Sequence, residues 1–229
     1  ADVVVYSCTK HMDGQGRVLG GAVLGKKKWV EEVLMPFIRN TGPAMSPFNA
    51  FQILQGVETL PLRMTRHCAN TDKVVAFLSA RSDIARVIHP SQQSGEEKRC
   101  ADTYLKGGLG GLVGFELKAG AEAGRKFINN LKLLYHVANI GDARSLAIHP
   151  ASTTHSQLTV EERALTGVSE GYVRLSIGLE HPDDILMRDH ENVFPGISHI
   201  NIVNEIPHSI FDLGKSFSTF RCASKSIFY

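Results

Sequence analysis

The sequence lacks long apolar stretches and closely spaced cysteines. A membrane-spanning helix needs about 20 consecutive apolar residues, and no stretch of the 229 residues approaches that length. The four cysteines lie far apart and form no C-x-x-C pair. This argues against a zinc ribbon or a disulfide scaffold and fits a reducing cytosol. We therefore expect a cytoplasmic protein without a membrane partner.

The chain also lacks a strong excess of charge. Its net charge is +2, and no basic run is longer than Lys26-Lys27-Lys28. A nucleic-acid partner is therefore not indicated. Apolar residues make up 43% of the chain and charged residues 21%, values that are ordinary for a globular protein. The length is sufficient for one or two domains with a real core.

The most informative segment is Ser7-Cys8-Thr9-Lys10, which follows an apolar run at residues 3–6 and precedes a glycine-containing loop at residues 13–17. A lysine placed there can form a Schiff base with an aldehyde cofactor, and the flanking hydroxyls of Ser7 and Thr9 can donate to phosphate oxygens. The alternative is a solvated lysine at a strand end, with both hydroxyls in an ordinary turn.

The apolar patterns predict alternating helices and strands. The continuous apolar run at residues 2–6 indicates a buried strand of the parallel type. Ser46 and Pro47 are typical of the first residues of a helix, and Thr159-x-x-Glu162 is a capping box. Further strands are expected at residues 18–24, 84–89, 112–118, 145–149 and 172–177. Further helices are expected at residues 27–38, 62–80 and 121–134 and from residue 182. Residues 91–105 have the polar composition of a loop, with room for one or two helical turns.

Four segments resemble one enzyme family. They are residues 1–21, 40–50, 141–155 and 172–180, and they occur in the family's order. The family is that of the pyridoxal-phosphate-dependent enzymes of Cys/Met metabolism, the trans-sulfuration enzymes. Within it, the chain looks most like the sulfhydrylases of O-acetyl- or O-succinylhomoserine.

The resemblance implies an α/β fold in two parts. Residues 1–61 would end a fold-type-I large domain, which has a mixed, mostly parallel sheet, and residues 62–190 would form a smaller α+β C-terminal domain. Residues 191–229 do not fit the family pattern and form an atypical tail. Family chains are considerably longer and carry the lysine near their middle. We therefore expect a C-terminal fragment that is incomplete as an enzyme.

The resemblance also implies the roles of individual residues. Lys10 would be the catalytic lysine that binds pyridoxal 5'-phosphate, and Ser7 and Thr9 would hold the cofactor phosphate. Arg174 would bind the substrate α-carboxylate in a two-point fork, with Asn139 near that carboxylate. Without the resemblance, Arg174 is an ordinary solvent-facing residue of an amphipathic strand.

No metal is expected. His149 and His155 are six residues apart, which does not place them on one helix face, and no carboxylate or cysteine completes a site.

The implied reaction is γ-replacement in sulfur amino-acid metabolism, in which sulfide or a thiol converts an O-acylhomoserine to homocysteine. One alternative is a γ-lyase that acts on methionine or cystathionine. The other is a non-catalytic remnant or one chain of a split enzyme. Family members assemble as dimers or tetramers, so we expect a homo-oligomer in the full-length form.

Overall fold

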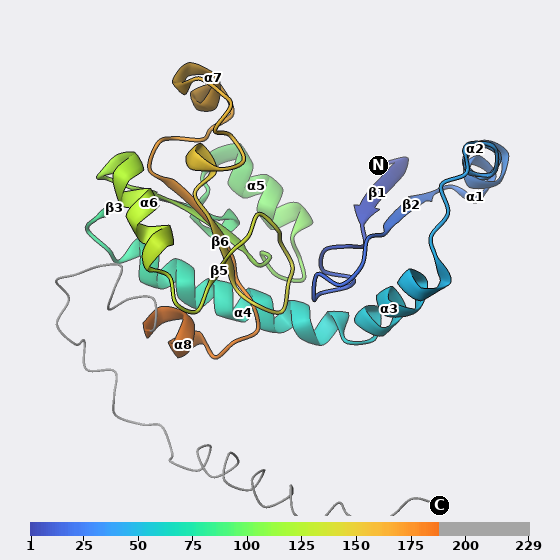
Figure 1. Ribbon diagram of the computed structural model, residues 1–229, viewed down its shortest axis with the longest axis horizontal. Helices are drawn as coiled ribbons and strands as arrows, with labels where there is room; N and C mark the ends of the chain where they lie inside the picture. The colour runs from blue at the N-terminus through green and yellow to red at the C-terminus, as the bar shows by residue number, and fades with distance from the viewer. Residues whose placement is uncertain (188–229) are drawn as a thin grey trace, which may run out of the picture. The chain divides into compact units, whose positions relative to one another are not determined.

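The computed structural model describes residues 1–187, which begin with an antiparallel pair of strands (Figure 1). β1 (Val3–Ser7) pairs with β2 (Gly21–Gly25), with Val3 opposite Gly25. The prediction of a buried, parallel-type strand at residues 2–6 is wrong. Among the described residues this sheet has two strands only, so the valines of β1 remain exposed. A continuous apolar run shows that a strand can be buried, but its neighbours decide whether it is.

Helices follow the hairpin. α1 (Lys27–Trp29), the π-helical turn η1 (Val30–Leu34) and α2 (Met35–Thr41) run in succession. In α3 (Pro47–Glu58) the Ser46 hydroxyl accepts a hydrogen bond from the Asn49 amide at 3.1 Å, which confirms the predicted N-cap. α4 (Leu60–Ser79) is the longest described helix. The expected boundary between residues 61 and 62 falls in its first turn.

A mixed five-stranded sheet forms the centre of the remaining described chain. The strand order is β3 (Ile84–Ile88), β4 (Leu112–Leu117), β7 (Tyr172–Ser176), β6 (Leu146–Ile148) and β5 (Tyr135–His136). Neighbouring strands are antiparallel except β5 and β6, which are parallel. This arrangement confirms the predicted α/β class. The short β5 was not predicted. The helix expected at residues 121–134 extended up to it, whereas α6 ends at Asn130.

Besides α4, the described residues of this region form four further helices: α5 (Gly95–Tyr104), α6 (Gly120–Asn130), α7 (Val160–Leu165) and α8 (Pro182–Met187). Two short 3₁₀ turns, η2 (Pro90–Gln92) and η3 (Pro150–Ser152), complete the connections. Residues 91–105 were predicted as a loop with at most one or two helical turns, but α5 is longer than that and occupies most of the segment. Ion pairs between Glu96 and Arg99 and between Lys98 and Asp102 support this polar helix.

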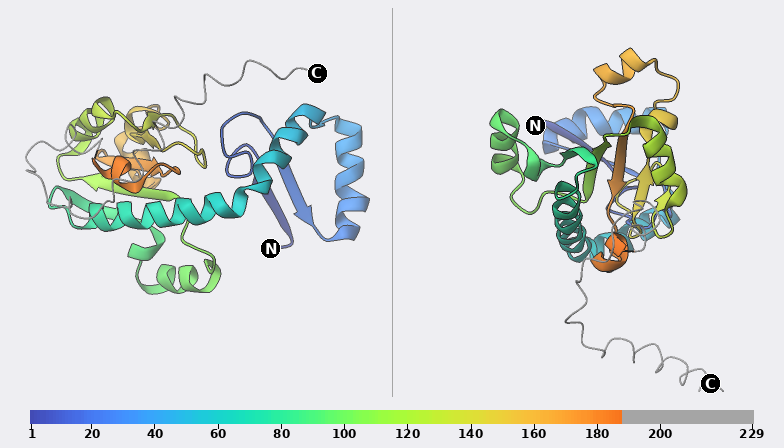
Figure 2. Two further views of the ribbon diagram at one scale, coloured as in Figure 1. Left: turned by 90° about the horizontal axis from the view of Figure 1, so that it is seen from below. Right: turned by 90° about the vertical axis from the view of Figure 1, so that its left-hand side faces the viewer.

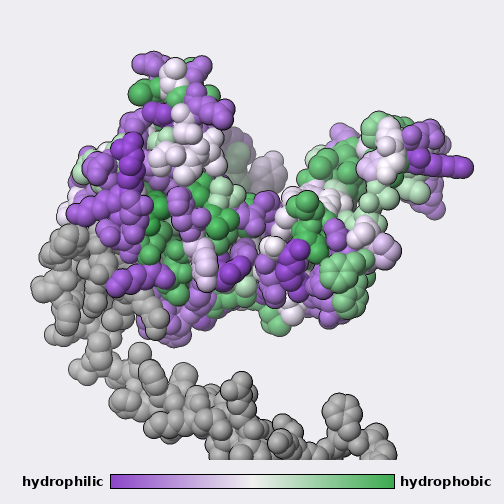
Figure 3. All heavy atoms as spheres, viewed as in Figure 1, coloured by the Kyte–Doolittle hydropathy of each residue, from purple (hydrophilic) through white to green (hydrophobic). Residues whose placement is uncertain are grey.

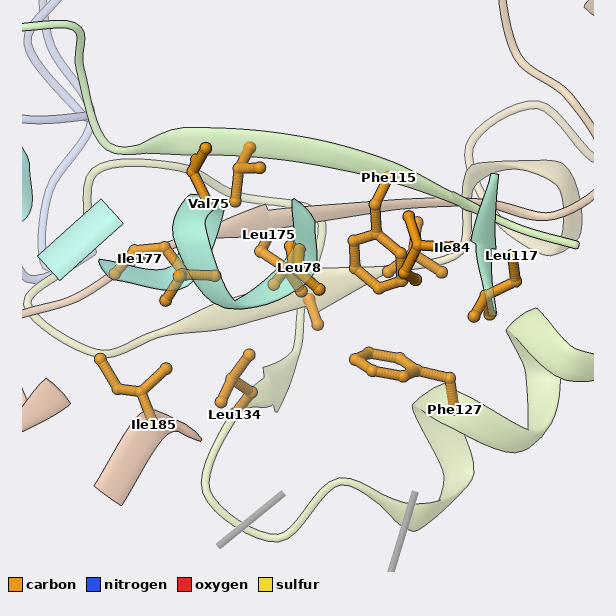
Figure 4. Packing of buried hydrophobic residues seen from close by; sticks show 14 of the residues in the cluster. Val75, Leu78, Ile84, Phe115, Leu117, Phe127, Leu134, Leu175, Ile177 and Ile185 are labelled. Atoms are coloured by element: carbon orange, nitrogen blue, oxygen red, sulfur yellow. The ribbon is translucent and has the colours of Figure 1, made fainter. Parts of the chain in front are cut away.

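The core lies between the sheet and the helices α4, α6 and α8 (Figure 4). α4 runs along the sheet (Figure 2) and contributes Val75 and Leu78. Phe115 of β4 is fully buried and meets Phe127 of α6 edge to face, with ring centroids 5.3 Å apart. Because such burial is the main stabilising term in folding, this sheet and its helices have a core of their own.

In the described part of the chain, no helix has the length and hydropathy needed to cross a membrane. The predicted tail at residues 191–229 lies outside the described residues.

Candidate active site

Lys10 stands in the tight loop that joins β1 to β2, which we call the lysine loop. The Lys10 amide donates to the Ser7 carbonyl at 3.2 Å, and the Gly14 amide donates to the Lys10 carbonyl at 2.8 Å. Gly14 and Gly16 have φ values of 73° and 63°, a conformation that side chains with a Cβ rarely adopt. The glycines recognised in the sequence therefore turn the chain back on itself and leave Lys10 half-buried.

Asp13 fixes the second half of this loop. Its side chain is buried, and its carboxylate accepts hydrogen bonds from the Arg17 amide at 2.7 Å and from Arg17 Nε at 2.9 Å. A carboxylate that accepts both a backbone and a charged donor is strongly held. The loop is thus closed by its own side chains before β2 begins.

The Lys10 amine reaches a second loop of the chain. Lys10 Nζ donates to Asn139 Oδ1 at 2.5 Å, and the backbone carbonyl of Asn139 accepts from Arg174 Nη2 at 3.2 Å. One residue therefore contacts both other groups. The structure brings together Lys10, Asn139 and Arg174, three predicted site residues from distant parts of the sequence.

Arg174 has unused hydrogen-bonding capacity. It lies on β7 between the buried residues Val173 and Leu175, and its Nε is buried without a hydrogen-bond partner among residues 1–187. Burial lowers the pKa of the guanidinium, while the nearby Tyr172 opposes that shift. Arginine remains cationic at neutral pH in either case. A buried donor that lacks an acceptor is costly, so a planar carboxylate would suit this position.

Ser7 and Thr9 flank the lysine on the hairpin side. The Thr9 hydroxyl accepts from the Gly20 amide at 3.1 Å and lies 3.4 Å from the Gly20 carbonyl. Ser7 is exposed at the end of β1. Their role in phosphate binding stays a prediction.

A contact between loops was not foreseen from the sequence. The Ala143 amide donates to the Gly14 carbonyl at 2.7 Å, and the Gly141 amide donates to the Ser176 hydroxyl at 3.1 Å. The segment that carries Asn139 is therefore held against the lysine loop on one side and against the end of β7 on the other. Pairing of this kind depends on the tertiary fold and has no signal in the local sequence.

The polar face of α4 was also missed. Arg63, His67 and Asn70 are buried and lie at positions i, i+4 and i+7 of the helix, so they share one face. The spacing is visible in the sequence, but polar residues at helical spacing usually face water, and their burial is shown only by the fold.

The buried His67 contacts the half-buried His11, which directly follows Lys10. Their rings meet edge to face with centroids 5.9 Å apart. His67 Nδ1 lies 2.6 Å from the Ile177 carbonyl, and since a carbonyl only accepts, Nδ1 carries the proton. His67 Nε2 is buried with no partner in the described chain. Burial is the main reason that the pKa of each histidine lies below its ordinary value, and Arg63 lowers both further.

The other histidines noted in the sequence do not form a metal centre. His149 is buried, with Nδ1 2.8 Å from the Ser152 hydroxyl and Nε2 2.8 Å from the Glu170 carbonyl. Both ring nitrogens are thus engaged in a structural turn. Within residues 1–187 there is no group of three or more His, Cys, Asp or Glu side chains placed to hold a metal ion.

A family model described as "Cys/Met metabolism PLP-dependent enzyme" matches residues 1–194. The chain belongs to this family. An O-acetyl-L-homoserine sulfhydrylase of Leptospira meyeri is 44% identical, with 82% of this chain and 51% of the relative covered. An L-methionine gamma-lyase of Pseudomonas putida is 43% identical, with 81% and 47% covered. The chain therefore spans about half the length of these curated relatives.

Solved structures of family members agree with the fold. A putative O-acetylhomoserine (thiol)-lyase of Campylobacter jejuni, which carries a pyridoxyl-lysine monophosphate, matches with a TM-score of 0.76 at 33% identity and covers 84% of this chain and 54% of that one. Cystathionine gamma synthase of Xanthomonas oryzae pv. oryzae matches with a TM-score of 0.77 at 33% identity, over 84% and 50% of the two chains. The expectation of a fold-type-I, pyridoxal-phosphate-dependent family is confirmed.

Proposed function

We propose that this chain supplies Lys10, Asn139 and Arg174 to the active site of an enzyme that replaces the γ-substituent of an O-acylhomoserine with sulfide or a thiol. The observation that carries the proposal is the position of Asn139, which contacts the Lys10 amine with its side chain and the Arg174 guanidinium with its carbonyl. The site thus presents an amine and a carboxylate-binding cation side by side, as an amino-acid substrate requires.

The residues present suit pyridoxal phosphate. Lys10 would hold the cofactor through Nζ, and the hydroxyls of Ser7 and Thr9 would donate to its phosphate. When bound, the cofactor supplies an electron sink for bond breaking at the substrate carbons. The Lys10 amine would take up and return protons at those carbons, because a free amine is a general base.

The substrate would be oriented by its α-carboxylate. The buried Arg174 Nε has no partner among the described residues and offers a donor that a carboxylate can use. The carbonyl of Asn139 limits where the guanidinium can turn, and its side-chain amide orients the Lys10 amine. Proper alignment of reacting groups contributes a large part of enzymatic rate enhancement.

A γ-lyase is the second candidate. Support for it comes from the methionine gamma-lyase relative, whose identity to this chain is 43% against 44% for the sulfhydrylase relative. Cleavage of methionine without an added thiol would favour the lyase, whereas homocysteine formed from O-acetylhomoserine and sulfide would favour the sulfhydrylase. A chain that binds the cofactor but needs a second polypeptide for turnover would be one part of a split enzyme. For the full-length protein we propose a homo-oligomer in the cytoplasm.

The direct test is to locate the lysine that reacts with the cofactor. The chain is incubated with pyridoxal phosphate and reduced with borohydride, and its peptides are analysed by mass spectrometry. We expect a pyridoxyl group on Lys10 and none at that position in Lys10→Arg, because a guanidinium stays protonated and forms no imine. Lys118 is exposed and provides the background, with Lys118→Arg as the matched control. Labelling of Lys10 at only the level of Lys118 would contradict the proposal.

A further inference from the structure

Arg63 of α4 packs against the lysine loop. The residue is 8% exposed, and its guanidinium donates to the carbonyls of His11 at 2.7 Å and Met12 at 3.3 Å. The same side chain donates to the Gly56 carbonyl at 2.6 Å and, through Nε, to the Thr59 hydroxyl at 3.0 Å. These acceptors are neutral oxygens, and two of them belong to the residues that directly follow Lys10. The charge of Arg63 is therefore used to hold the backbone of this loop.

The loop fits closely around the guanidinium. A Cβ atom added to Gly14 would lie 2.6 Å from Arg63 Cζ, which is closer than real side chains approach. On the other side, a Cβ atom added to Gly56 would lie 2.7 Å from the Asp13 carbonyl oxygen. Glycine at both positions allows the backbone to approach α3 and Arg63. The path of residues 11–14 is thus set by the α3–α4 junction.

The same helix also holds the strand that carries Arg174. His67 Nδ1 lies 2.6 Å from the Ile177 carbonyl, and Asn70 Nδ2 donates to the carbonyls of Gly178 and Glu180 at 2.9 Å each. These acceptors lie in the four residues that follow β7. One face of α4 therefore fixes both the loop of Lys10 and the end of the Arg174 strand, and with them the separation of the amine from the carboxylate-binding group.

We propose that Arg63 is a positioning residue for Lys10. Without its guanidinium the carbonyls of His11 and Met12 lose their donor, and buried carbonyls left without a donor favour opening of the loop toward water. The Lys10 amine then leaves Asn139. The proposal rests on the proposed role of Lys10 in cofactor binding, but the hold on the loop can be measured without the cofactor.

The test uses two variants that remove the contact from opposite sides. Arg63→Met deletes the donors, and Gly14→Ala pushes the loop off an intact Arg63. Arg66→Met is the matched control for the first, because Arg66 is an exposed arginine of the same helix. Gly120→Ala is the control for the second, because Gly120 has φ of 70°, close to the 73° of Gly14, but no atom within 4 Å of an added Cβ.

Two quantities are measured on the 229-residue chain. One is hydrogen exchange of amides 10–16, and the other is the rate of borohydride-trapped pyridoxyl formation at Lys10. In Arg63→Met and Gly14→Ala we expect amides 10–16 to exchange about tenfold faster and Lys10 to label about tenfold more slowly. Both controls should stay within about twofold of the parent. Hydrogen exchange in β4 and β7 should not change. A general loss of stability would instead make these strands exchange faster as well.

Parental exchange and labelling in Arg63→Met would overturn the proposal. If Arg63→Met does not fold, Gly14→Ala decides, since it keeps the arginine. Failure of both to fold would also overturn it, because Arg63 would then be needed for folding as a whole. If the parent does not label at Lys10, the proposed function fails, and the exchange of amides 10–16 still tests the hold of Arg63 on the loop.

Discussion

Residues 1–61 and residues 62–187 differ in how they bury apolar side chains. The second region has a continuous core in which residues such as Phe115, Val173 and Ile177 are fully buried. The first has a small cluster of Cys8, Val18 and Ile53 beside the lysine loop. Most of the exposed large apolar side chains in the described chain belong to residues 1–61. Figure 3 shows such side chains at the surface over α3.

The difference shows what each region can stabilise alone. The stabilisation of a fold is roughly proportional to the apolar area that it buries. Residues 62–187 therefore contribute most of the stability of the described chain. Residues 1–61 carry Lys10 and depend on contacts such as that of Arg63 with the His11 carbonyl. The proposed cofactor lysine is thus held in place by the region with the core.

The largest expected effect compares one phenylalanine from each region. Phe115→Ala removes a fully buried ring and should lower the free energy of unfolding by about 3–5 kcal/mol. Phe48 of α3 is 65% exposed, so Phe48→Ala should change the free energy of unfolding by no more than about 0.5 kcal/mol. Urea denaturation followed by circular dichroism measures both values. A loss of more than about 2 kcal/mol for Phe48→Ala would show that α3 packs against a surface in solution and would break the comparison.

The next effect concerns substrate binding by the proposed carboxylate site. Arg174→Lys replaces the two-point fork with a point charge and should weaken binding of an O-acylhomoserine by about 10- to 100-fold. The measured quantity is the dissociation constant of the O-acylhomoserine, or KM in a form of the enzyme that is active. Arg86→Lys is the control, because Arg86 is exposed on β3 and pairs with Glu116. An unchanged KM in Arg174→Lys would remove the carboxylate role from Arg174.

Local features of the fold were predicted well from the sequence. The Ser46 cap is confirmed, and so is the capping box, in which the Thr159 amide donates to Glu162 Oε2 at 2.8 Å and the Glu162 amide donates to the Thr159 hydroxyl at 3.2 Å. Each depends on residues three positions apart, so the sequence contains all that decides it. The burial of β1 was predicted wrongly, because it depends on neighbours that a strand's own residues do not specify.

The site shows the same division between local and tertiary information. Lys10, Asn139 and Arg174 were predicted separately, each through the resemblance of the chain to the family. That Asn139 contacts both other residues follows from the packing of the loop at residues 139–143 against Gly14, which no local pattern encodes. Arg63 was missed because an arginine in a helix is usually solvated, and only the fold shows it to be buried.

A smaller effect is expected from three histidines, of which His11 lies in the first region and His67 and His89 lie in the second. The pKa values of His11, His67 and His89 lie below the ordinary 6.5, chiefly because burial disfavours the charged form. Above about pH 7 these groups are neutral in both states, with no effect on stability. Below the pKa that these histidines have in the unfolded chain, the unfolded chain binds more protons than the folded chain. The free energy of unfolding therefore falls as the pH decreases. The slope is at most about 1.4 kcal/mol per pH unit for each histidine.

The measurement is the free energy of unfolding between about pH 7.5 and 5.5, across the ordinary histidine pKa. His67→Gln should reduce the pH dependence, because it removes one of the groups that take up a proton on unfolding. His136→Gln changes an exposed histidine of β5 and should leave the dependence as it is. An equal pH slope in His67→Gln and the parent would show that His67 does not contribute to acid destabilisation.

The smallest expected effect compares one helix cap from each region. Ser46→Ala removes the hydroxyl that accepts from the Asn49 amide, and Thr159→Ala removes the hydroxyl that accepts from the Glu162 amide. Each loss should destabilise its helix by about 1 kcal/mol, seen as faster hydrogen exchange in the first turn of α3 or α7. Thr65→Ala on the exposed side of α4 serves as control, since its hydroxyl donates to a carbonyl of its own helix. Because α3 has most of its apolar side chains exposed, the effect of Ser46→Ala should stay within α3. Spread of faster exchange from Ser46→Ala into β4 and β7 would show that the two regions unfold together, and the difference in their cores would then not divide the chain into units of different stability.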